Sequence, residues 1–277
     1  MGDDWAADDR APLFDDEGSA REFVRAAGGR WVGARLRYFD EVDSANSRAR
    51  RLADLGWPVG TAVLAEHQTE GRGKLRRRWF CPPCAGLLVS VLVPAAAPGG
   101  PDVAWLTAAG ALAMAAAVEA ACGIGLRVDW PNDLVVADPT GPSGHRKVGG
   151  VLVETRQGAE AAVLGVGLNV DVRADEFQAD LRLTAGSLRS VFGRRFDRLE
   201  ILGRFLPELE RRIDDPDGLG NELRTMSFTL GREVAVEAVP APRRGTAVGF
   251  DERMRLLVEF PDGAREAVTA LAAGDVA

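Results

Sequence analysis

The sequence predicts an α+β protein, in which a mixed or antiparallel sheet is packed by helices and followed by a small β-barrel. Strand-like and helix-like apolar patterns are interspersed up to about residue 227. Two adjacent apolar segments, 147–155 and 161–170, are spaced as a hairpin. From about Phe228, short strand patterns follow one another between turn signals. We therefore expect an N-terminal extension (1–35), a main domain (36–227) and a small barrel domain (228–277).

The N-terminal extension is acidic over residues 1–20 and lacks apolar periodicity, so we expect most of it to be loosely ordered. A short helix is expected at 19–28, with Ser19 as its N-cap. The extension offers no room for a helix-turn-helix DNA-binding domain. Three of its apolar side chains could dock onto the surface: Trp5, Leu13 and Phe14.

The main domain begins with a strand, helix and strand pattern. Ser44 can cap a helix over 44–55, which Gly56 ends. A second helix, over 102–122, is dense in alanine and should pack closely. Further helices are expected at about 174–180 and 197–213, and strands at 36–42, 59–66, 86–93, 126–130, 134–136, 147–155 and 161–170, with a long polar loop over 67–83.

The C-terminal domain is expected to contain four short strands, which prolines and an Asp-Gly turn separate. Short strands at this spacing predict a small β-barrel. The expected strands are 233–239, 246–250, 255–260 and 265–270.

Composition excludes several classes of function. The net charge of −7 argues against general affinity for nucleic acid or an anionic membrane. No early stretch resembles a signal peptide, and the longest apolar run, 108–121, is interrupted by Glu119 and too short to span a bilayer. Three cysteines do not form a secreted-type disulfide framework. We therefore expect a cytoplasmic protein with neither DNA nor a membrane as its partner.

The loop 71–79 is the first candidate site. Five of the seven residues from Arg72 to Arg78 are basic, and two glycines would let the backbone approach a ligand closely. Basic side chains and exposed N–H groups together make an anion site, although a solvated charged loop is the alternative. Only two of the 34 basic residues are lysines, Lys74 and Lys147, and both lie in glycine-rich loops.

Known phosphate-binding motifs do not fit this loop. Gln68 and Leu75 occupy the places where a Walker A motif needs its first glycine and its Ser or Thr. The segment 165–170 begins like a dinucleotide-binding fingerprint, but it lacks the third glycine and a following helix.

Two further constellations are candidates. Asp133 follows the turn of Trp130-Pro131-Asn132, where an acid could bind a metal or orient a basic partner, or could simply cap the turn. Lys147 enters a buried strand and is followed by Gly149 and Gly150, which suits a backbone that leaves room for a flat ligand. That lysine could neutralise charge at a reacting phosphate, or could be an ordinary strand-edge residue.

The order and spacing of these motifs resemble the biotin protein ligases from about residue 36 to 270. The motifs are Asp43-Ser44-Ala45-Asn46, the loop with Gln68, Arg72, Gly73, Lys74 and Trp79, Trp130-Pro131-Asn132-Asp133, the segment 147–154, and 165–169. The resemblance implies a class II synthetase-like catalytic domain over 36–227 that binds biotin and ATP, and an SH3-like barrel at the C-terminus.

The resemblance also implies roles for single residues. Lys147, Arg72 and Asp133 would be catalytic. Biotin would be bound by Ser44, Ala45, Asn46, Gln68, Arg72, Gly73, Lys74, Lys147, Gly149 and Gly150. The nucleotide would be bound by Arg72, Lys74, Arg77, Trp79, Asn132, Asp133, Lys147 and Asn169.

The chemistry implied by the resemblance is the activation of biotin to biotinyl-5′-AMP with ATP, followed by transfer to a lysine of a biotin carboxyl carrier protein domain. The enzyme would supply positioning and positive charge, with Mg²⁺ shielding the triphosphate. No metal ligand is assigned with certainty. Both monomers and homodimers are compatible with the family.

Three positions depart from the family pattern. Lys74 stands where the family usually has Arg, so the loop should retain the adenylate less tightly. Asp129 replaces the usual Lys before Trp130, which should lower the affinity for ATP. Ala45 replaces the usual Thr and loses a hydroxyl contact.

The pair Cys81 and Cys84 is interpreted as two loop thiols, with a redox latch beside the ligand loop as the alternative. Three other functions remain open: a lipoate-type acyl ligase, a degenerate biotin-binding paralogue with little turnover, and a dual repressor-ligase. The acidic N-terminus argues against the last of these.

Overall fold

A seven-stranded mixed sheet forms the centre of the protein, in a computed structural model that describes residues 10–95, 102–139, 144–156, 158–238 and 241–272. The strand order is β1-β2-β3-β7-β6-β5-β4. β1 and β2 pair in parallel, and the other neighbours pair antiparallel. The strands are β1 (Arg35–Val42), β2 (Thr61–Gln68), β3 (Gly86–Pro94), β4 (Arg127–Asp129), β5 (Asp133–Ala137), β6 (His145–Glu154) and β7 (Ala161–Asn169).

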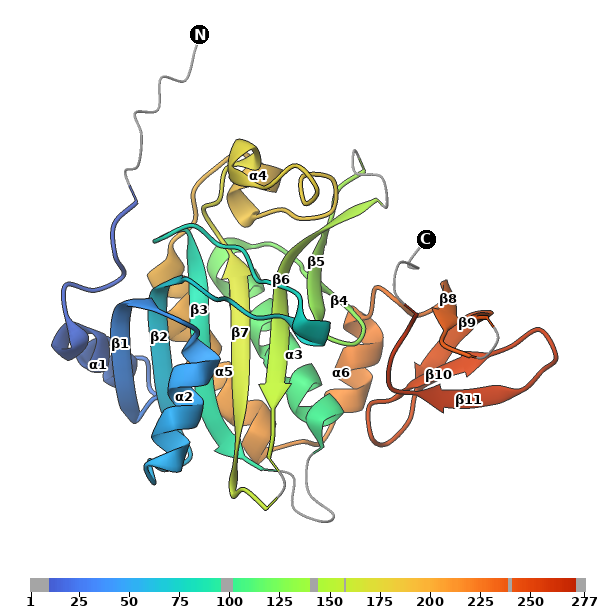
Figure 1. The fold of residues 1–277 in the computed structure, drawn as a ribbon, viewed down its shortest axis with the longest axis horizontal. Helices are drawn as coiled ribbons and strands as arrows, with labels where there is room; N and C mark the ends of the chain where they lie inside the picture. The colour runs from blue at the N-terminus through green and yellow to red at the C-terminus, as the bar shows by residue number, and fades with distance from the viewer. Residues whose placement is uncertain (1–9, 96–101, 140–143, 157, 239–240, 273–277) are drawn as a thin grey trace, which may run out of the picture.

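Helices cover both faces of this sheet. Helix α2 packs against β2, β3 and β7 on one face, while α3 packs against β6 and β7 on the other face and is itself covered by α5 (Figure 1). The α+β prediction with a mixed sheet is therefore confirmed. The helices are α1 (Glu17–Ala26), α2 (Ala45–Asp54), α3 (Val103–Cys122), α4 (Leu188–Phe192), α5 (Arg198–Asp214) and α6 (Leu219–Met226), with single 3₁₀ turns at Lys74–Arg76 and Ala174–Glu176.

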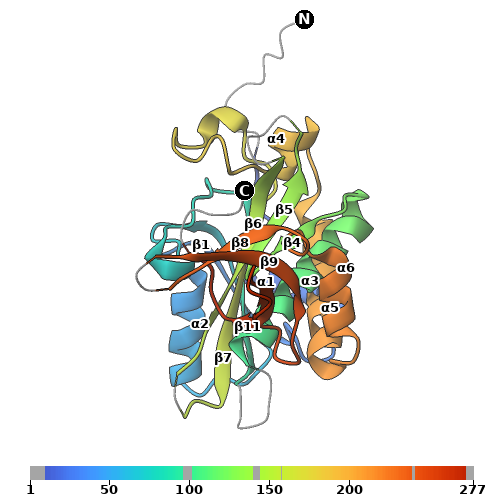
Figure 2. The same ribbon diagram turned by 90° about the vertical axis from the view of Figure 1, so that its right-hand side faces the viewer.

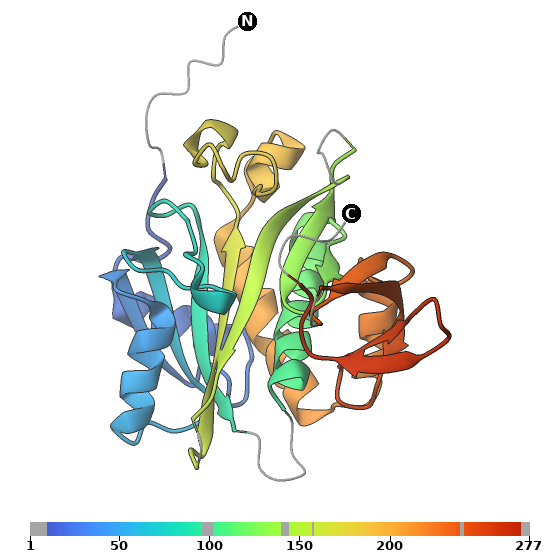
Figure 3. The same ribbon diagram turned by 45° about the vertical axis from the view of Figure 1, so that its right-hand side comes forward.

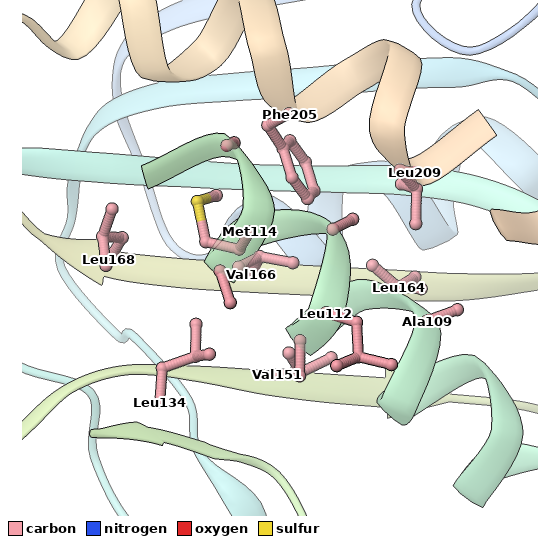
Figure 4. Packing of buried hydrophobic residues seen from close by; sticks show 14 of the residues in the cluster. Ala109, Leu112, Met114, Leu134, Val151, Leu164, Val166, Leu168, Phe205 and Leu209 are labelled. Atoms are coloured by element: carbon pink, nitrogen blue, oxygen red, sulfur yellow. The ribbon is translucent and has the colours of Figure 1, made fainter. Parts of the chain in front are cut away.

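Helix α3 is the core of the main domain. It is apolar on all sides because it is buried between the sheet and α5, where Ala109, Leu112 and Met114 meet side chains of β5, β6, β7 and α5 (Figure 4). By length and composition alone, α3 is also the single helix among the described residues that could cross a membrane. Its burial shows that it is a core helix.

The start of the described chain confirms the expected docking of Leu13 and Phe14 but is more ordered than the sequence predicts. Residues 10–14 are not a loose extension: Phe14 is buried against Tyr38, and Arg10 pairs with Glu176. Helix α1 begins at Glu17 because the side chain of Asp16, and not that of Ser19, is its N-cap. Ser19 instead completes a capping box with Asp16. Trp5 lies outside the described residues.

In the second half of the chain, one helix prediction was wrong and two helices were not predicted. The expected helix over 174–180 is a single 3₁₀ turn, because Phe177 already has an extended backbone and directs its side chain into the core. The helices α4 and α6 were not predicted, since five and eight residues are too few to display a helical period.

The C-terminal part forms a separate four-stranded antiparallel sheet of order β11-β10-β9-β8 (Figure 2). Its strands are β8 (Glu233–Val236), β9 (Arg243–Phe250), β10 (Leu256–Glu259) and β11 (Arg265–Val268). It stands beside β4 and α6 (Figure 3). The short antiparallel strands agree with the prediction, whereas the closed SH3-like barrel stays a prediction.

A buried ion pair ties the N-terminal segment to the sheet. The carboxylate of Glu66 on β2 accepts hydrogen bonds from the Leu13 backbone N–H (2.7 Å), from the Tyr38 hydroxyl (2.9 Å) and from Arg198 of α5 (2.7 Å). The side chain of Glu66 is only 3% exposed and that of Arg198 10%. A charge buried this deeply depends on its partner.

We predict that Arg198→Ala lowers the free energy of unfolding by about 3–5 kcal/mol, because it leaves Glu66 buried without its counter-charge. The control is Arg211→Ala on the same helix, which removes an exposed pair with Glu208 and should cost at most about 1 kcal/mol. Urea unfolding of both variants is the measurement. Equal losses in the two variants would contradict the assigned role of the buried pair.

Candidate functional site

The loop between β2 and β3 is a closed hairpin that crosses in front of β7 and β6 (Figure 1). The N–H of Trp79 donates to Gly71 O (2.9 Å), and the N–H of Gly73 donates to Arg77 O (2.8 Å). Leu75 turns the tip with a left-handed backbone (φ 56°) and is 72% exposed. The basic segment is therefore a defined structure, although Leu75 has to adopt a conformation that side chains disfavour.

The packing of the loop explains one of its two glycines, Gly71, but not the other, Gly73. A Cβ at Gly71 would lie 2.5 Å from Trp79 O, so only glycine allows the two arms of the hairpin to approach. A Cβ at Gly73 would meet Arg77 O at 3.5 Å, which is an ordinary contact. Gly73 is therefore not required by the packing within the loop, and its expected role toward a ligand stays a prediction.

Arg72 extends from the loop to α2 and β6. Its guanidinium donates to the Ser47 hydroxyl (3.0 Å) and to Glu154 Oε2 (3.2 Å), and its buried Nε has no hydrogen-bond partner among the described residues. The guanidinium is thus held at the sheet and still has donor groups available.

Asn46 stands on the sheet at the start of α2. Its Nδ2 donates to Leu152 O (3.2 Å) and Glu154 Oε2 (2.8 Å), while its Oδ1 accepts from the Ser90 hydroxyl (2.6 Å). It lies directly above Gly165, where a Cβ would come within 2.0 Å of Asn46 Oδ1. The bare backbone at Gly165 therefore makes the position of Asn46 possible.

The start of α2 also meets the end of β2. The side chain of Gln68 accepts a hydrogen bond from the Ala45 N–H (2.8 Å), one of the orphan donors at the helix N-terminus. Ser44 occupies the N-cap position and is buried, but its side chain makes no capping hydrogen bond. The hydroxyl of Ser44 thus remains available in the place where the sequence analysis expects biotin.

A β-bulge brings Lys147 to this same face. Gly149 is opposite Leu134 and Lys147 is opposite Val135, so Val148 is an extra residue on β6. The bulge places Lys147 on the side of Asp133, and its Nζ lies 2.7 Å from Asp133 Oδ1. The same Nζ lies 5.9 Å from the centre of the Trp79 ring.

Gly149 and Gly150 keep the strand open beside this ion pair. A Cβ at Gly149 would lie 3.0 Å from Gly167 O and from a Leu134 methyl carbon. A Cβ at Gly150 would face Asp133 Oδ1 at 3.5 Å and Lys147 Cε at 3.6 Å. The packing therefore favours glycine at Gly149, where a Cβ would press on the backbone of β7 and on Leu134, whereas the contacts of a Cβ at Gly150 would be ordinary ones.

Lys74 on the loop is close enough to Asp133 to be affected by its negative charge, as Lys147 is. Burial lowers the pKa of Lys74, and the negative charge of Asp133 acts in the opposite direction. Lys74 and Lys147 are the two lysines of the chain, and both are near one carboxylate. Two cations around one acid leave positive charge for an anionic ligand.

Trp79 and Asn169 contribute buried polar groups without partners. The indole of Trp79 lies on Gly167, where a Cβ would come within 2.7 Å of the ring. Its Nε1 and the Oδ1 of Asn169 are both buried without a hydrogen-bond partner among the described residues. Asn169 is two residues beyond Gly167 on β7, hence on the same face. Unpaired buried groups are costly, which favours a ligand that completes them.

The other two predicted nucleotide-binding residues are Asn132 and Arg77. Asn132 uses its Nδ2 to donate to Val151 O (3.2 Å), so its amide holds the turn before β5. Arg77 is exposed on the second arm of the hairpin and makes no described ion pair. The structure thus brings to one face Arg72, Lys74, Trp79, Asp133, Lys147 and Asn169, while the nucleotide-binding role of Arg77 stays a prediction.

Asp129 lies directly opposite Asp133 in the pairing of β4 with β5, and its carboxylate is bound by the segment that leads to the C-terminal sheet. Its carboxylate accepts from the Thr229 hydroxyl (2.8 Å), which in turn accepts from the Trp130 N–H (2.7 Å). Trp130 Nε1 donates to Met254 O (3.1 Å). Asp129, which stands where the family usually has a lysine, is therefore accommodated by a hydrogen bond to Thr229 next to Asp133. Its expected effect on the affinity for ATP stays a prediction.

The two loop cysteines are poor candidates for redox chemistry. Cys81 is buried, and burial raises its pKa to about 12. Burial also raises the pKa of Cys84, and the nearby negative charge of Glu66 adds to this. A raised pKa depletes the thiolate, which is the reactive form. This favours the interpretation as structural thiols over a redox latch.

Sequence reasoning missed Glu154, Ser47 and Ser90, whose hydrogen bonds fix Arg72 and Asn46. Two sequence features could have indicated these residues: an acid at the end of an apolar strand, and the glycines at 165 and 167. The glycine pair is a floor for Asn46 and Trp79 within β7, so it is not a dinucleotide-binding loop.

A cavity of about 460 Å³ lies elsewhere, between α1 and the start of β1. Arg25, Arg35 and Trp57 are among its lining residues, and none of the residues of the candidate site is. The candidate site lies apart from this cavity, on the face of β6 and β7 beneath the loop.

Comparisons with known proteins agree with this geometry. The sequence matches the biotin/lipoate A/B protein ligase family over residues 38–171. It is 33% identical over 279 residues to a biotin–[acetyl-CoA-carboxylase] ligase of Mycobacterium tuberculosis, covering 96% of each chain. It is 29% identical over 252 residues to the bifunctional ligase/repressor BirA of Bacillus spizizenii, covering 86% of this chain and 74% of that one. Its structure is similar to that of a biotin protein ligase from Aquifex aeolicus in complex with biotin and ATP, with a TM-score of 0.69, 26% identity, and coverage of 86% of this chain and 96% of that chain.

Asp129 generates a prediction about pH. Burial raises its pKa and Asp133 adds to this, while the Thr229 hydrogen bond, His145 and Arg232 act in the opposite direction. Above about pH 4 the unfolded chain loses this proton while the folded chain retains it. The stability contribution of Asp129 should therefore decrease as the pH rises from about 4 through the raised pKa.

Asp129→Asn keeps an acceptor for Thr229, so it should remove this decrease and raise the free energy of unfolding at neutral pH. Urea unfolding across a pH series is the measurement, with the exposed Glu252→Gln as a control that should leave the profile unchanged. A pH profile of Asp129→Asn that parallels that of the parent would contradict the assignment.

Proposed function

This chain belongs to the biotin protein ligases, and we propose that it activates biotin with ATP to biotinyl-5′-AMP and transfers the biotinyl group to a lysine of a biotin carboxyl carrier protein domain. In the first step a biotin carboxylate oxygen bonds to the α-phosphorus of ATP, and pyrophosphate leaves. In the second, the carrier lysine bonds to the acyl carbon, loses a proton, and AMP leaves. The chain is thus a ligase that forms a carbon–nitrogen bond.

The observation that carries this proposal is the convergence of cations on the glycine floor of β6 and β7. Arg72 is fixed at the floor beside Asn46, and Lys147 stands beside Trp79. Both reaction steps pass charge through an α-phosphate, so positioned cations are the assistance that they need. The relative from Aquifex aeolicus is described with biotin and ATP, which agrees with two ligands on this face.

The residues divide into two neighbouring sets. Ser44, Asn46 and Gln68 form the end where biotin is proposed to bind, since their polar groups surround the start of α2. Trp79 and Asn169 form the nucleotide end, where their unpaired polar atoms lie. Lys147 stands beside Trp79, where the carboxylate and the α-phosphate would meet.

Mg²⁺ is proposed to arrive with the triphosphate. Among the described residues no group of three or more His, Cys, Asp and Glu side chains could hold a metal by itself. Magnesium commonly takes one or two carboxylates together with substrate phosphates, and Asp133 is the acid of this face that could contribute. The residues therefore fit a metal that the nucleotide brings.

The carrier domain is proposed as the protein partner because the relative from Mycobacterium tuberculosis is named a biotin–[acetyl-CoA-carboxylase] ligase. The same proposal includes an SH3-like barrel for the C-terminal sheet, a cytoplasmic location and no DNA partner. The net charge of −7 supports the absence of general DNA binding, and the three unpaired cysteines suit a reducing compartment. A monomer and a homodimer both remain compatible with the proposal.

The test of the proposed function is mass spectrometry of the purified protein after incubation with biotin, ATP and Mg²⁺. Biotinyl-AMP is the expected product. Lipoate replaces biotin in a parallel sample, where no adenylate is expected. Lipoyl-AMP without biotinyl-AMP would indicate the lipoate ligase, while bound biotin without pyrophosphate release would indicate a degenerate binding protein.

We predict that Lys147→Gln lowers the rate of biotin-dependent pyrophosphate release by roughly 10²- to 10³-fold, because it removes a fixed donor from the reacting phosphate. Arg265→Gln, an exposed cation of the C-terminal sheet, is the matched control and should retain the parent rate. Circular dichroism of both variants checks the fold. An undiminished rate in Lys147→Gln would rule out the assigned role.

Lys74 gives a second prediction for the same reaction. An ammonium is a point charge, whereas a guanidinium can donate two parallel hydrogen bonds to a phosphate. Lys74→Arg should therefore slow the release of biotinyl-AMP on the order of tenfold, or about 1.4 kcal/mol. Release is followed by trapping free adenylate after dilution. An unchanged release rate would show that this position does not control retention.

A further inference from the structure

The carboxylate of Glu154 connects three elements around the proposed biotin end of the site. It stands at the last residue of β6, and its side chain is 25% exposed. Oε2 accepts from Asn46 Nδ2 (2.8 Å) and from the Arg72 guanidinium (3.2 Å), and Oε1 lies 3.5 Å from Arg50 of α2. The start of α2, the ligand loop and the sheet therefore meet at one side chain.

We propose that Glu154 is a positioning residue for biotin binding, which holds Arg72 and Asn46 in their ligand-ready places through hydrogen bonds to both. This inference rests on the proposed function, since it concerns the biotin end of the same site. Glu154 itself need not touch the ligand, because Oε2 is engaged by the two residues that it orients and Oε1 faces Arg50.

The hydrogen-bond donors of Arg72 are consistent with Glu154 orienting Arg72 and Arg72 contacting the ligand. A guanidinium carries five N–H groups, and the described contacts of Arg72, to Ser47 and Glu154, both use one terminal nitrogen. Its Nε is buried without a partner among the described residues. Glu154 therefore holds one corner of the guanidinium while other donors stay free for an anionic ligand.

The contacts of Asn46 lead to the same conclusion. Its Oδ1 is taken by Ser90 and its Nδ2 is shared between Leu152 O and Glu154. Without the carboxylate, the amide loses its shortest acceptor and α2 loses a link to β6. Removing Glu154 also leaves Arg50 and Arg72 as two cations without their shared counter-charge, which favours their separation.

The position of Glu154 predicts which kinetic constant it controls. The residue lies seven positions beyond Lys147 on β6, and none of its described contacts involves Lys147, Asp133 or Trp79. Its loss should thus weaken the binding of biotin while the chemical step at Lys147 proceeds almost normally. A residue with only a structural role would lower stability without this separation of KM from kcat.

The test compares Glu154→Ala and Glu154→Gln with the parent in biotin-dependent pyrophosphate release, with thermal unfolding recorded for each. We expect Glu154→Ala to raise the KM for biotin about tenfold and to change kcat less than about threefold. Glu154→Gln keeps an acceptor for Asn46 but loses the charge that binds Arg72, so its KM should be intermediate. Glu160→Ala, an exposed acid on the same β6–β7 hairpin, should match the parent.

A double variant separates action through Arg72 from independent effects. If Glu154 acts by orienting Arg72, Arg72→Gln combined with Glu154→Ala should raise KM little more than Arg72→Gln alone. Fully multiplied effects of the two substitutions would overturn the proposed coupling.

An unchanged KM in folded Glu154→Ala, or a loss confined to kcat, would overturn the proposal. If Glu154→Ala fails to fold, Glu154→Gln decides the question by the same criteria. Calorimetric titration with biotin alone keeps this test apart from the proposed function. A parent that binds biotin without forming biotinyl-AMP refutes the activity, while the affinities of the variants still test the positioning role.

Discussion

The close approach of side chains to the bare backbone of β6 and β7 is the constraint on which the site depends. Asn46 can stand above Gly165 and Trp79 can lie on Gly167 only because neither position has a Cβ. These two contacts place α2 and the basic loop on the same face of the sheet. On the opposite face, α3 and α5 bury the apolar side of the same strands and keep the floor rigid (Figure 4).

The positions of the charged residues depend on this glycine surface of β6 and β7. The bulge at Val148 turns Lys147 to the side of Asp133, and the hairpin brings Arg72 and Lys74 over the same strands. Arg72 pairs with Glu154 and Lys147 pairs with Asp133, and the charge of the same Asp133 also acts on Lys74. Such an arrangement orients positive charge before a ligand arrives, so little reorganisation remains for the reaction itself.

Much of the fold could be predicted from local patterns. Helices α2 and α5 have a clear helical period, whereas α3 and the central strand β3 are marked by continuous apolar runs. The hairpin of β6 and β7 follows from two apolar segments with a short connection. The short helices α4 and α6 have too few turns to show a period. The apolar side chains of Leu13 and Phe14 indicate their docking, but the ion pair of Glu66 with Arg198 that holds this segment joins residues 132 positions apart, which no local pattern reveals.

The site could be predicted where a motif has a distinctive composition, as the basic loop does. It was harder to predict where tertiary contacts determine the position of a side chain. Asp129 lies opposite Asp133, but its hydrogen bond to Thr229, 100 positions away, is one that no local pattern reveals. Glu154 was read as the end of a strand, because its role depends on partners from α2 and the loop. A strand period gives the face of a residue only until a bulge such as that at Val148 shifts it.

The central claim is that the hairpin 71–79 covers a ligand bound on the floor of β6 and β7. Amide hydrogen exchange of this hairpin, measured by mass spectrometry with and without biotin and ATP, tests it most directly. The account predicts slower exchange over residues 72–78 in the presence of both ligands and unchanged exchange in β8 and β9. Equal exchange of the hairpin in the two samples, although the ligands are bound, would contradict it.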